Sequence, residues 1–496
     1  MLSFPDAALV QHDPALPGLA LLFDPLALLA ALRLRAPDNR SLRSVQSLQI
    51  AYIRYKPRTS CLIGYRAVAY GNAPRIMENE QTEKTDEAVV LCAVAHCPDA
   101  DDKLQKATKK SVVEAVPKRV ALEQGVVVSF FPDDRALPSL THLVDRQTRV
   151  ALLKKLLPQY PDLWNATPRV LAYKPARRCV LRLRNEEHPE KSVVLRFYTK
   201  SGFEASRGKA RRFSSGGNLR FPQAVAKSTR HAALVMEWLP GLPLNRVLES
   251  SGESPDAACL AMEKVGAAWA QLHTRSGGRL PLRTRESEAR ALLAAARGAG
   301  AVWPPLARRA TKLARLLSVR LNAQSFAPRA MHGDFYASQV LLPKNQSEPI
   351  VLLDLDEAAC GDPALDLGNF VAHLELDVLR GLLPAQNAKD FCAALLTGYN
   401  RVAKNDAFAF GDISVATAVG LMRLTPEPFR THQPQWPEQI EAILARIESL
   451  LESSTTDGLA TSRKASSTPP IVKSSTRFDD LGAATSDGAM PFLVQA

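Results

Sequence analysis

Short apolar runs separated by polar turns recur in the second half of the chain and predict strands. Residues 340–342 and 350–353 are apolar and flank a polar, proline-bounded turn at 343–349, a pattern typical of an antiparallel hairpin. Pairing these strands brings Asp334 and Asp354 to the same end of the hairpin, although roughly twenty residues separate them in the chain. The hairpin therefore predicts a site that contains two carboxylates.

Alternating apolar and polar positions predict a second group of strands further upstream. Residues 171–183 alternate as two strands around a basic turn that contains Lys174, Arg177 and Arg178, and residues 192–198 continue as a third strand. These segments predict a small antiparallel sheet with positive charge at one turn.

The first third of the chain repeats this pattern. Residues 55–66 are a second copy of 173–182, with tyrosine, lysine, proline and cysteine at matching places. Downstream, the apolar run 126–132 resembles the run that ends at Pro240. Chance recurrence is the alternative, but the matched cysteine and the second run favour a repeated supersecondary unit.

The motifs around the hairpin also resemble a known family. His332-Gly333-Asp334, then Leu353-Asp354-Leu355-Asp356, then Gly361-Asp362-Pro363 follow one another in the order and spacing of the aminoglycoside phosphotransferase and choline kinase-like family. This resemblance covers about residues 168–450. It implies an α+β, bilobal protein kinase-like fold, with a small antiparallel β lobe and a mainly helical lobe, preceded here by a degenerate copy of the small lobe.

The resemblance and the repeat together imply a division of the chain. The expected units are an N-terminal extension (1–40), a degenerate small-lobe-like domain (41–150), an ATP-grasping lobe (166–240), a helical catalytic lobe (241–452) and a disordered tail (453–496). The tail is expected to be disordered because serine, threonine, aspartate, glycine and proline replace the apolar periodicity there.

The resemblance implies ATP and Mg²⁺ as cofactors. Asp334 is expected to orient an acceptor hydroxyl and take its proton, and His332 to brace the loop by hydrogen bonding. Gln339, Asp354 and Asp356 are the expected metal ligands, since Mg²⁺ prefers oxygen donors. The family usually has asparagine where this chain has Gln339, and glutamine keeps the amide oxygen.

The resemblance also implies which residues contact the nucleotide. They are Lys174, Arg177, Arg178, Arg196, Lys200, Glu237 and Leu239. The family usually has lysine at the place of Arg196, and arginine is not an equivalent replacement because its group is planar and bulkier. Lys200 is the alternative cation, and Glu204 is the candidate partner on the following helix. A solvated basic turn is the competing interpretation of 174–178.

Residues after the hairpin are expected to hold the loop and to meet the acceptor. Asp362 and Asp366 are expected to fix the loop and cap the next helix. His273 belongs to a helical pattern and is expected to be structural. The acceptor is expected to contact the helices that follow, for example around Glu375, Asp377 and Tyr399.

Composition restricts the function further. The 496 residues can fold into two or three domains, and the formal net charge of +13 suits anionic ligands. The basic clusters at 106–110 and 207–212 lack interleaved aromatic residues, so nucleic acid is not the expected partner. The apolar run at 19–29 is interrupted by Asp24 and predicts no membrane span or signal peptide. Seven scattered cysteines predict reduced thiols and a cytoplasmic protein.

Two functions follow from these patterns. The first is an ATP-dependent kinase that phosphorylates a hydroxyl of a sugar, amino sugar or amino alcohol. The second is a nucleotide-binding pseudokinase with a regulatory or scaffolding role, which the changed lysine position favours. The presence of both Asp334 and Asp354 favours the enzyme.

Overall fold

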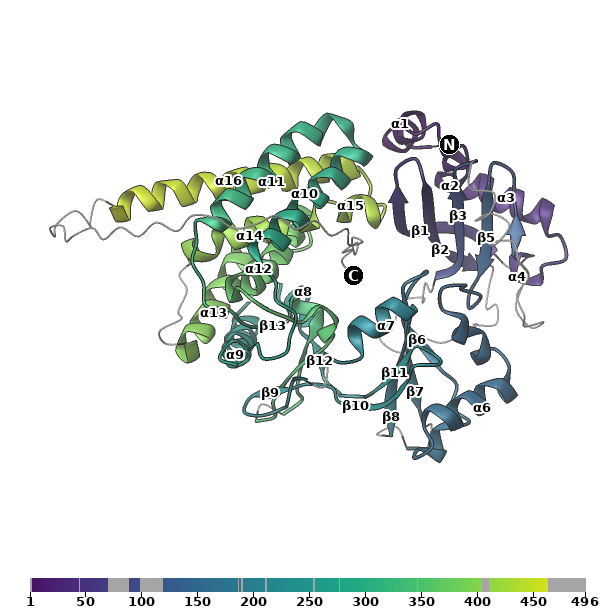
Figure 1. Ribbon diagram of the computed structural model, residues 1–496, viewed down its shortest axis with the longest axis horizontal. Coiled ribbons are helices and arrows are strands. Elements are labelled where there is room, and N and C mark those ends of the chain that lie inside the picture. Colours follow the sequence, from purple (N-terminus) through teal and green to yellow (C-terminus); the bar gives the residue numbers. More distant parts are fainter. Residues whose placement is uncertain are drawn as a thin grey trace, which may run out of the picture.

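The computed structural model contains two antiparallel sheets and a helical lobe (Figure 1). It describes residues 2–43, 45–69, 89–98 and 119–462, except 186, 189–190, 210–211, 253–254, 276, 346 and 404–409. The basic run at 106–110 lies outside the described residues.

The first sheet has five antiparallel strands in the order β1-β2-β3-β5-β4. Their bounds are β1 (Val45–Lys56), β2 (Ser60–Ala69), β3 (Val89–His96), β4 (Val120–Ala121) and β5 (Val126–Phe130). One face is covered by α1 (Phe4–His12), α2 (Leu19–Phe23), α3 (Pro25–Arg35) and α4 (Arg40–Arg43). Leucines of these helices and the inward residues of the strands form one core. Residues 1–40, which the sequence predicts as a separate extension, therefore pack as part of this unit.

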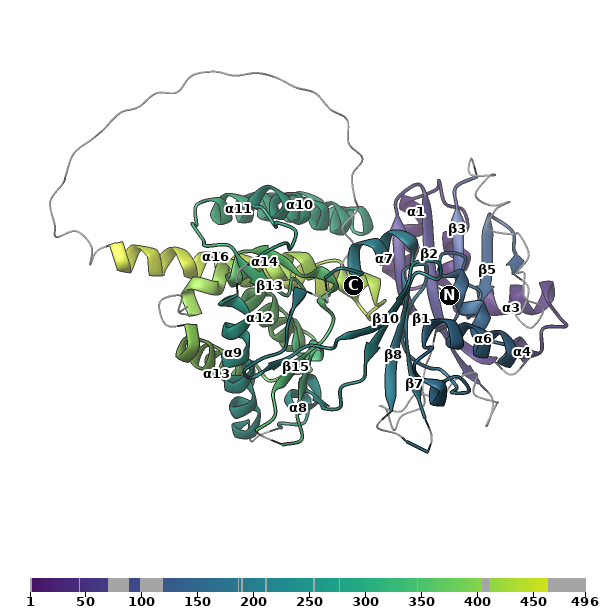
Figure 2. The same ribbon diagram turned by 60° about the horizontal axis from the view of Figure 1, so that its bottom comes forward.

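The second sheet also has five antiparallel strands, in the order β6-β7-β8-β11-β10. They are β6 (Arg169–Lys174), β7 (Arg178–Arg184), β8 (Ser192–Tyr198), β10 (Ala224–Ser228) and β11 (Ala233–Glu237). The helix α6 (Arg146–Leu156) precedes them and α7 (Lys200–Ser206) follows β8. The second sheet thus has the same order of neighbours as the first, and Figure 2 shows the two side by side.

A hydrogen-bonded turn joins β1 to β2 in the first sheet. Arg58 has a positive φ of 59°, a left-handed conformation that is uncommon for a residue with a side chain. One oxygen of Asp13 accepts hydrogen bonds from the Tyr55 hydroxyl at 2.6 Å and from the Arg58 N–H at 2.8 Å. A carboxylate from outside the sheet therefore stabilises this strained turn.

The turn between β6 and β7 has the same construction. Ala176 has a φ of 55°, and Asp134 accepts hydrogen bonds from the Tyr173 hydroxyl at 2.9 Å and the Ala176 N–H at 2.6 Å. Both aspartates begin a similar segment, Asp13-Pro14-Ala15-Leu16-Pro17 and Asp134-Arg135-Ala136-Leu137-Pro138. We propose that each repeated unit begins at these aspartates, upstream of the repeat that the sequence pattern indicates.

The helical lobe contains the remaining elements. Its helices are α8 (Leu244–Glu249), α9 (Asp256–His273), α10 (Arg285–Val302), α11 (Ala307–Asn322), α12 (Pro363–Leu379), α13 (Ala385–Ala403), α14 (Phe410–Leu424), α15 (Glu427–Arg430) and α16 (Trp436–Ser462). The chain remains helical to Ser462, beyond the expected start of the tail at 453. This sheet-plus-helix arrangement is the bilobal kinase-like fold that the sequence predicts.

Two small sheets lie where the helical lobe meets the second sheet. One has the order β12-β14-β15-β9, and the other pairs β13 with β16. Their bounds are β9 (Leu219–Arg220), β12 (Leu242–Pro243), β13 (Arg329–Met331), β14 (Val340–Leu342), β15 (Ile350–Leu352) and β16 (Ala359–Gly361). β14 and β15 pair antiparallel, so the predicted hairpin is confirmed.

Aromatic contacts join the first unit to the helical lobe. The Phe429 ring of α15 lies 6.2 Å from both Phe23 and Tyr55, measured between ring centroids. The Trp436 indole N–H donates to Asp6 at 3.3 Å. Because the core of the first unit continues into α10, α11, α14 and α16, these two parts form one packed body.

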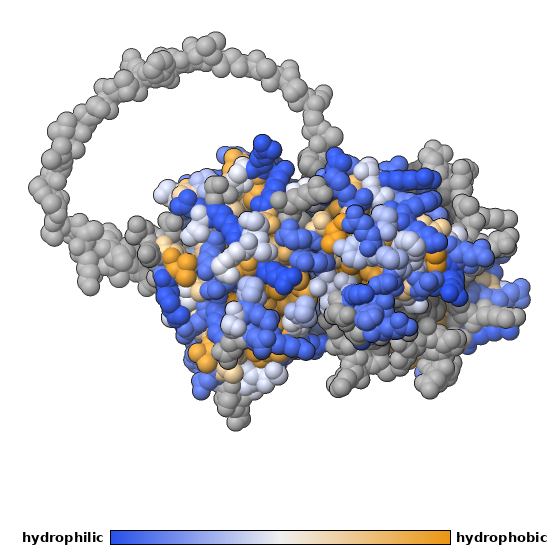
Figure 3. All heavy atoms as spheres, turned by 90° about the horizontal axis from the view of Figure 1, so that it is seen from below, coloured by the Kyte–Doolittle hydropathy of each residue, from blue (hydrophilic) through white to orange (hydrophobic). Residues whose placement is uncertain are grey.

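The surface agrees with the composition. Figure 3 shows one face on which hydrophilic residues predominate and hydrophobic residues form small patches. Among the described helices, none is both long and apolar enough to cross a membrane. All seven cysteines are free thiols, as the sequence predicts.

Two glycines allow the helices α9 and α13 to approach each other closely. A Cβ at Gly266 of α9 would collide with the Leu395 carbonyl of α13, and one at Gly398 of α13 would collide with the Glu263 carbonyl of α9. These neighbours are backbone atoms, which cannot rotate away as a side chain would. The approach of α9 to α13 therefore requires glycine at both positions.

We predict that Gly398→Ala lowers the free energy of unfolding by about 3 kcal/mol, because the added methyl overpacks this contact. Gly298→Ala in α10 is the matched control, since its Cβ would meet nothing closer than Pro426 Cγ at 3.9 Å. It should stabilise the protein slightly through helix propensity. Urea denaturation measures both, and equal stability of the two variants would contradict the prediction.

Candidate active site

The loop 332–334 follows β13 and is held by a buried carboxylate. Asp366 of α12 accepts hydrogen bonds from the backbone N–H groups of His332 at 2.7 Å and Gly333 at 2.9 Å. Gly333 has a φ of +86°, and a Cβ there would collide with the Glu357 carbonyl. The loop therefore needs glycine at this position and an acceptor behind it, and Asp366 supplies the acceptor.

His332 ties the same loop to the end of β15. Its Nε2 lies 2.7 Å from the Leu353 carbonyl oxygen and donates to it, and its Nδ1 accepts from the Asp334 N–H at 3.4 Å. This pairing corresponds to the neutral imidazole with its proton on Nε2. The ring spans the hairpin end and keeps Asp334 beside the residues that follow Leu353.

A second buried histidine supports Asp366 from behind. His273 Nε2 lies 3.3 Å from Asp366, and its Nδ1 lies 2.9 Å from the Tyr399 hydroxyl. Burial acts to raise the pKa of Asp366, but the hydrogen bond and charge of His273, with further effects from His332 and Gly333, bring it below its usual value. His273 is thus structural, as expected. Tyr399 is buried, and its expected contact with the acceptor stays a prediction.

Two arginines of the second sheet bind the carboxylates after β15. Arg178 donates to both oxygens of Asp354, at 2.8 and 3.2 Å, and to Asp356 at 3.1 Å. Arg196 donates to Asp354 at 3.1 Å. Tyr198 donates to Asp356 at 3.3 Å. These contacts join the small lobe to the helical lobe, and we call Arg178, Arg196, Asp354 and Asp356 the interlobe ion cluster.

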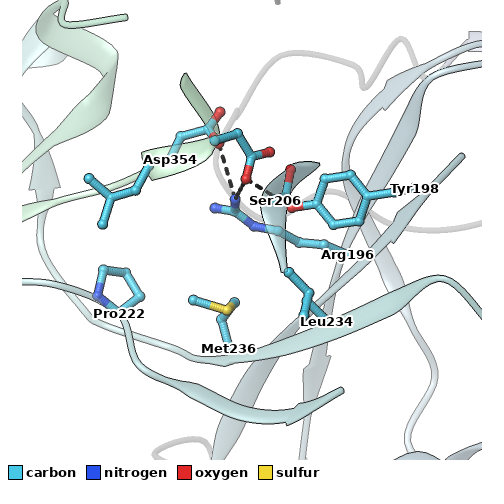
Figure 4. A pocket seen from close by; sticks show the side chains of 9 residues that line it. Arg196, Tyr198, Ser206, Pro222, Leu234, Met236 and Asp354 are labelled. Atoms are coloured by element: carbon cyan, nitrogen blue, oxygen red, sulfur yellow. Dashed lines mark hydrogen bonds and ion pairs between the residues drawn. The ribbon is translucent and has the colours of Figure 1, made fainter. Parts of the chain in front are cut away.

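Figure 4 shows Arg196 extending from β8 toward Asp354, beside Met236 and Tyr198. The cavity at this point has a volume of about 20 Å³, room for about one water molecule. Asp354 has a φ of 55°, so the backbone adopts a left-handed conformation at the carboxylate that both arginines contact. Such a conformation in a non-glycine residue is often found at functional sites.

The three carboxylates differ in their pKa values. Burial acts to raise the pKa of Asp354, but Arg178 and Arg196 outweigh it and hold this pKa well below its usual value. Burial and the charge of Asp354 raise the pKa of Asp356. Burial also raises the pKa of Asp334 to about 6, with contributions from the charges of Asp354 and Glu357. A carboxyl with that pKa is suited to accept a proton near neutral pH.

The other predicted site residues make the following local contacts. Gln339 is buried, and its side-chain amide donates to the Tyr336 hydroxyl at 3.0 Å. Leu239 is buried and packs with Leu341 and Val351. The Glu237 side chain accepts from the Gln223 N–H at 3.1 Å.

Lys200 and Glu204, which the sequence predicts at this site, both lie on helix α7. Lys200 is exposed as the first residue of α7, whereas Arg196 makes the contact with Asp354. Glu204, the expected partner of that cation, pairs instead with Arg207 at 2.7 Å. The nucleotide contact expected of Lys200 stays a prediction, whereas in this structure Arg196 and not Lys200 pairs with Asp354.

Sequence reasoning assigned no role to four residues near the site, Tyr198, Lys209, Tyr336 and His373. Tyr198 binds Asp356, the Lys209 ammonium donates to the Asp356 carbonyl, and the Tyr336 ring stacks on His373 at 4.5 Å. The alternation of the strand Ser192–Tyr198 puts Tyr198 on the face of Arg196, so this residue could have been found from the sequence. Lys209 and His373 carry no such signal.

These residues suit phosphoryl transfer, and a comparison with known protein families identifies the family. Residues 144–404 match the model of the phosphotransferase enzyme family. The chain belongs to this family. It is therefore a member of a family of phosphotransferases. No curated protein sequence matches it.

Solved structures of similar fold come from kinases of small molecules. The phosphotransferase is similar to choline kinase from Cryptosporidium parvum Iowa II, with 10% identity over 65% of this chain and 99% of that one and a TM-score of 0.47. It is similar to a choline/ethanolamine kinase family protein from Mesorhizobium loti, with 16% identity over 62% and 95% and a TM-score of 0.40. The GDP complex of aminoglycoside 2′-phosphotransferase-IIIa shows 14% identity over 62% and 99%, with a TM-score of 0.42.

The residues present fit a divalent cation in donor type. A carboxylate offers about four lone-pair positions, and Asp354 uses three of them for guanidinium hydrogen bonds. Asp356 accepts from Arg178 and Tyr198. Each carboxylate therefore keeps an acceptor position for a hard cation such as Mg²⁺, although the described part of the chain has no group of three or more His, Cys, Asp or Glu residues placed to hold a metal ion.

We predict that Asp366→Asn lowers the free energy of unfolding by about 2 kcal/mol at neutral pH, because one buried N–H of the loop loses its acceptor. The low pKa of Asp366 stabilises the folded state above the unfolded pKa of this group. The difference in stability between the variant and the wild type should therefore shrink as the pH falls below the unfolded pKa of this carboxyl. Urea denaturation from neutral pH down to about pH 2 measures it, because the stability that a lowered carboxyl pKa provides is lost between roughly pH 5 and pH 1.

Asp377→Asn is the matched control on the same helix. Burial raises the pKa of Asp377, so its charge costs stability at neutral pH. This variant should be as stable as wild type or slightly more stable. An Asp366→Asn protein with wild-type stability would show that Asp366 does not hold the loop.

Proposed function

We propose that this phosphotransferase is a kinase that transfers the γ-phosphate of ATP to a hydroxyl of a sugar, amino sugar or amino alcohol. The observation that supports the proposal most directly is the position of Asp334. Its raised pKa and its place beside Asp354 provide a proton acceptor next to a pair of carboxylates suited to a metal. Phosphoryl transfer needs this combination, with positive charge around the phosphate oxygens.

In this proposal each group of the site has one task. Asp334 orients the acceptor hydroxyl and takes its proton as the hydroxyl oxygen bonds to the γ-phosphorus and the bond to the β–γ bridging oxygen breaks. His332 and Asp366 hold the loop so that the carboxylate of Asp334 stays in place. When bound, Mg²⁺ would neutralise charge on the phosphates, with Asp354 and Asp356 as its ligands and Gln339 as a further oxygen donor.

The second sheet would supply the nucleotide contacts. Arg178 and Arg196 are positioned to bind phosphate oxygens bidentately once they release part of their hold on Asp354. Leu239 and Val351 belong to a small buried apolar cluster, which would lie next to the base. The backbone around Glu237 and Leu239 follows directly and would hydrogen-bond the base.

We predict that Mg²⁺-dependent binding of ATP requires Asp354 but not Asp334. Asp354→Asn should lose the effect of Mg²⁺ on ATP binding, because it removes the charge that attracts the cation. Asp334→Asn should bind Mg²⁺ and ATP like wild type yet form no phosphorylated product. Calorimetric titration with and without Mg²⁺ measures binding. Failure of the wild-type protein to bind ATP would contradict the proposal, and binding without turnover on any acceptor would support the pseudokinase instead.

A further prediction concerns the stability cost of Asp334. The folded-state pKa of Asp334, about 6, is higher than its unfolded-state pKa. As the pH rises from the unfolded-state pKa to the folded-state pKa, the folded protein therefore loses stability, because the charged carboxylate is disfavoured in it. Asp334→Asn should therefore raise the free energy of unfolding at pH 7.5 by about 2 kcal/mol, and the gain should vanish near pH 4. Urea denaturation at the two pH values measures the gain, and a variant less stable than wild type at both would contradict it.

A further inference from the structure

An arginine from another part of the chain contacts the peptide group that precedes Asp334. Arg283 immediately precedes the N-cap residue of α10, and its Nη1 donates a hydrogen bond to the Gly333 carbonyl at 3.0 Å. Its backbone N–H donates to the Cys360 carbonyl of β16 at 2.8 Å. Since β16 pairs with β13, the strand that leads into the loop, both the backbone and the side chain of Arg283 are fixed beside it.

The peptide group between Gly333 and Asp334 is held at both ends. Arg283 binds its carbonyl oxygen, and His332 Nδ1 accepts from its N–H at 3.4 Å. A peptide group is planar, so contacts at its two ends restrict its rotation and with it the direction in which Asp334 carries its side chain. The restriction matters here because Gly333, with a φ of +86°, has no side chain that would limit its own backbone.

Helix α12 holds the loop on both sides of this peptide group, but through other atoms. Asp366 accepts hydrogen bonds from two backbone N–H groups ahead of it. The Asn369 side-chain amide donates to the Phe335 carbonyl at 2.9 Å. The Gly333 carbonyl lies between these contacts, and Arg283 binds it.

A buried carboxylate holds the Arg283 side chain in place. Arg283 Nε lies 3.1 Å from Glu288 of α10, and Glu288 also pairs with Arg423 of α14. The side chains of Glu288, Arg423 and Arg283 are 2%, 5% and 15% exposed, so water hydrates these charges poorly. We call Arg283, Glu288 and Arg423 the loop brace, because they connect the loop to α10 and α14.

The loop brace contains one cation more than the charge of Glu288 needs. Arg423 alone would neutralise this carboxylate, and the second guanidinium has a cost: burial and the charge of Arg283 hold the pKa of Arg423 well below its usual value. What Arg283 adds is the hydrogen bond to the loop. Its planar guanidinium can point one nitrogen at Glu288 and another at Gly333.

We infer that Arg283 is a positioning residue for phosphoryl transfer, which acts through the Gly333 carbonyl to hold the Asp334 carboxylate where the acceptor hydroxyl would bind. Glu288 and Arg423 act through Arg283 by fixing its guanidinium. The inference rests on the proposed role of Asp334 in the kinase reaction.

Hydrogen exchange of the full chain tests the loop brace without any reaction. Arg283→Met keeps the length of the side chain, removes its donors and leaves Glu288 paired with Arg423. The amides of Gly333 and Asp334 should exchange roughly tenfold faster or more in this variant, because a hydrogen bond from a charged group is lost. Arg309→Gln, which removes ion pairs between α11 and α16, is the control and should leave these amides unchanged.

ATP hydrolysis with Mg²⁺ tests the catalytic consequence, with water as the probe acceptor and the rate of Asp334→Asn subtracted. Arg283→Met should lower kcat between roughly tenfold and a hundredfold, the effect of a displaced catalytic group, and leave the KM for ATP unchanged. Arg283→Lys should recover part of the loss, because an ammonium can donate to the carbonyl but lacks the fork that also reaches Glu288. Arg309→Gln should have the kcat of the wild type.

Two results would overturn the inference alone: unchanged exchange of the loop amides in Arg283→Met, or faster exchange with the kcat of the wild type. The second result is what a merely structural role predicts. Wild-type protein without Asp334-dependent hydrolysis would overturn the inference together with the proposed role of Asp334, so the two failures are distinguishable. Thermal unfolding of each variant identifies any that does not fold, and Arg283→Lys then remains as the milder variant for both measurements.

Discussion

The interlobe ion cluster is the interaction on which the site depends. Arg178 and Arg196 come from neighbouring strands of the small lobe, and Asp354 and Asp356 come from the helical lobe. Their side chains are between 12% and 19% exposed, so the charges are poorly hydrated and strongly coupled. Removing one partner from such a group leaves an uncompensated charge. The cluster therefore fixes the distance between the lobes, and with it the distance from the basic turn to Asp334.

The first unit adds a second constraint on the same geometry. Asp13 and Asp134 hold equivalent turns in the two sheets, but the residues that follow have diverged. In the register of β2 and β3, Ser60 and Val94 occupy the places that Arg178 and Arg196 occupy in the second sheet. The first sheet therefore lacks the cations of a phosphate site. It keeps the turn, and its strand β1 packs against α15. The first sheet therefore borders the helical lobe.

Much of the fold could be predicted because its signals are local. The hairpin 340–352 follows from two apolar runs and a proline-bounded turn, and His332, Asp334 and Asp354 follow from a motif with fixed spacing. The path of α7 could not be predicted, and the ion pair of Glu204 with Arg207 depends on it. The packing of residues 2–39 on the first sheet and the contact of Tyr55 with Phe429 depend on contacts between distant segments. No periodicity in the chain encodes those contacts.

The replacement of lysine by Arg196 has a physical consequence for nucleotide binding. An ammonium group would contact one carboxylate as a point charge, whereas the planar guanidinium of Arg196 lies 3.1 Å from Asp354 and 4.0 Å from Asp356. With Arg178 beside it, two positive charges already neutralise the two carboxylates. A cation alone gains little there, because it competes with both arginines. A polyphosphate can bind the arginines and so release the carboxylates to the cation, and for this reason nucleotide and metal should bind cooperatively.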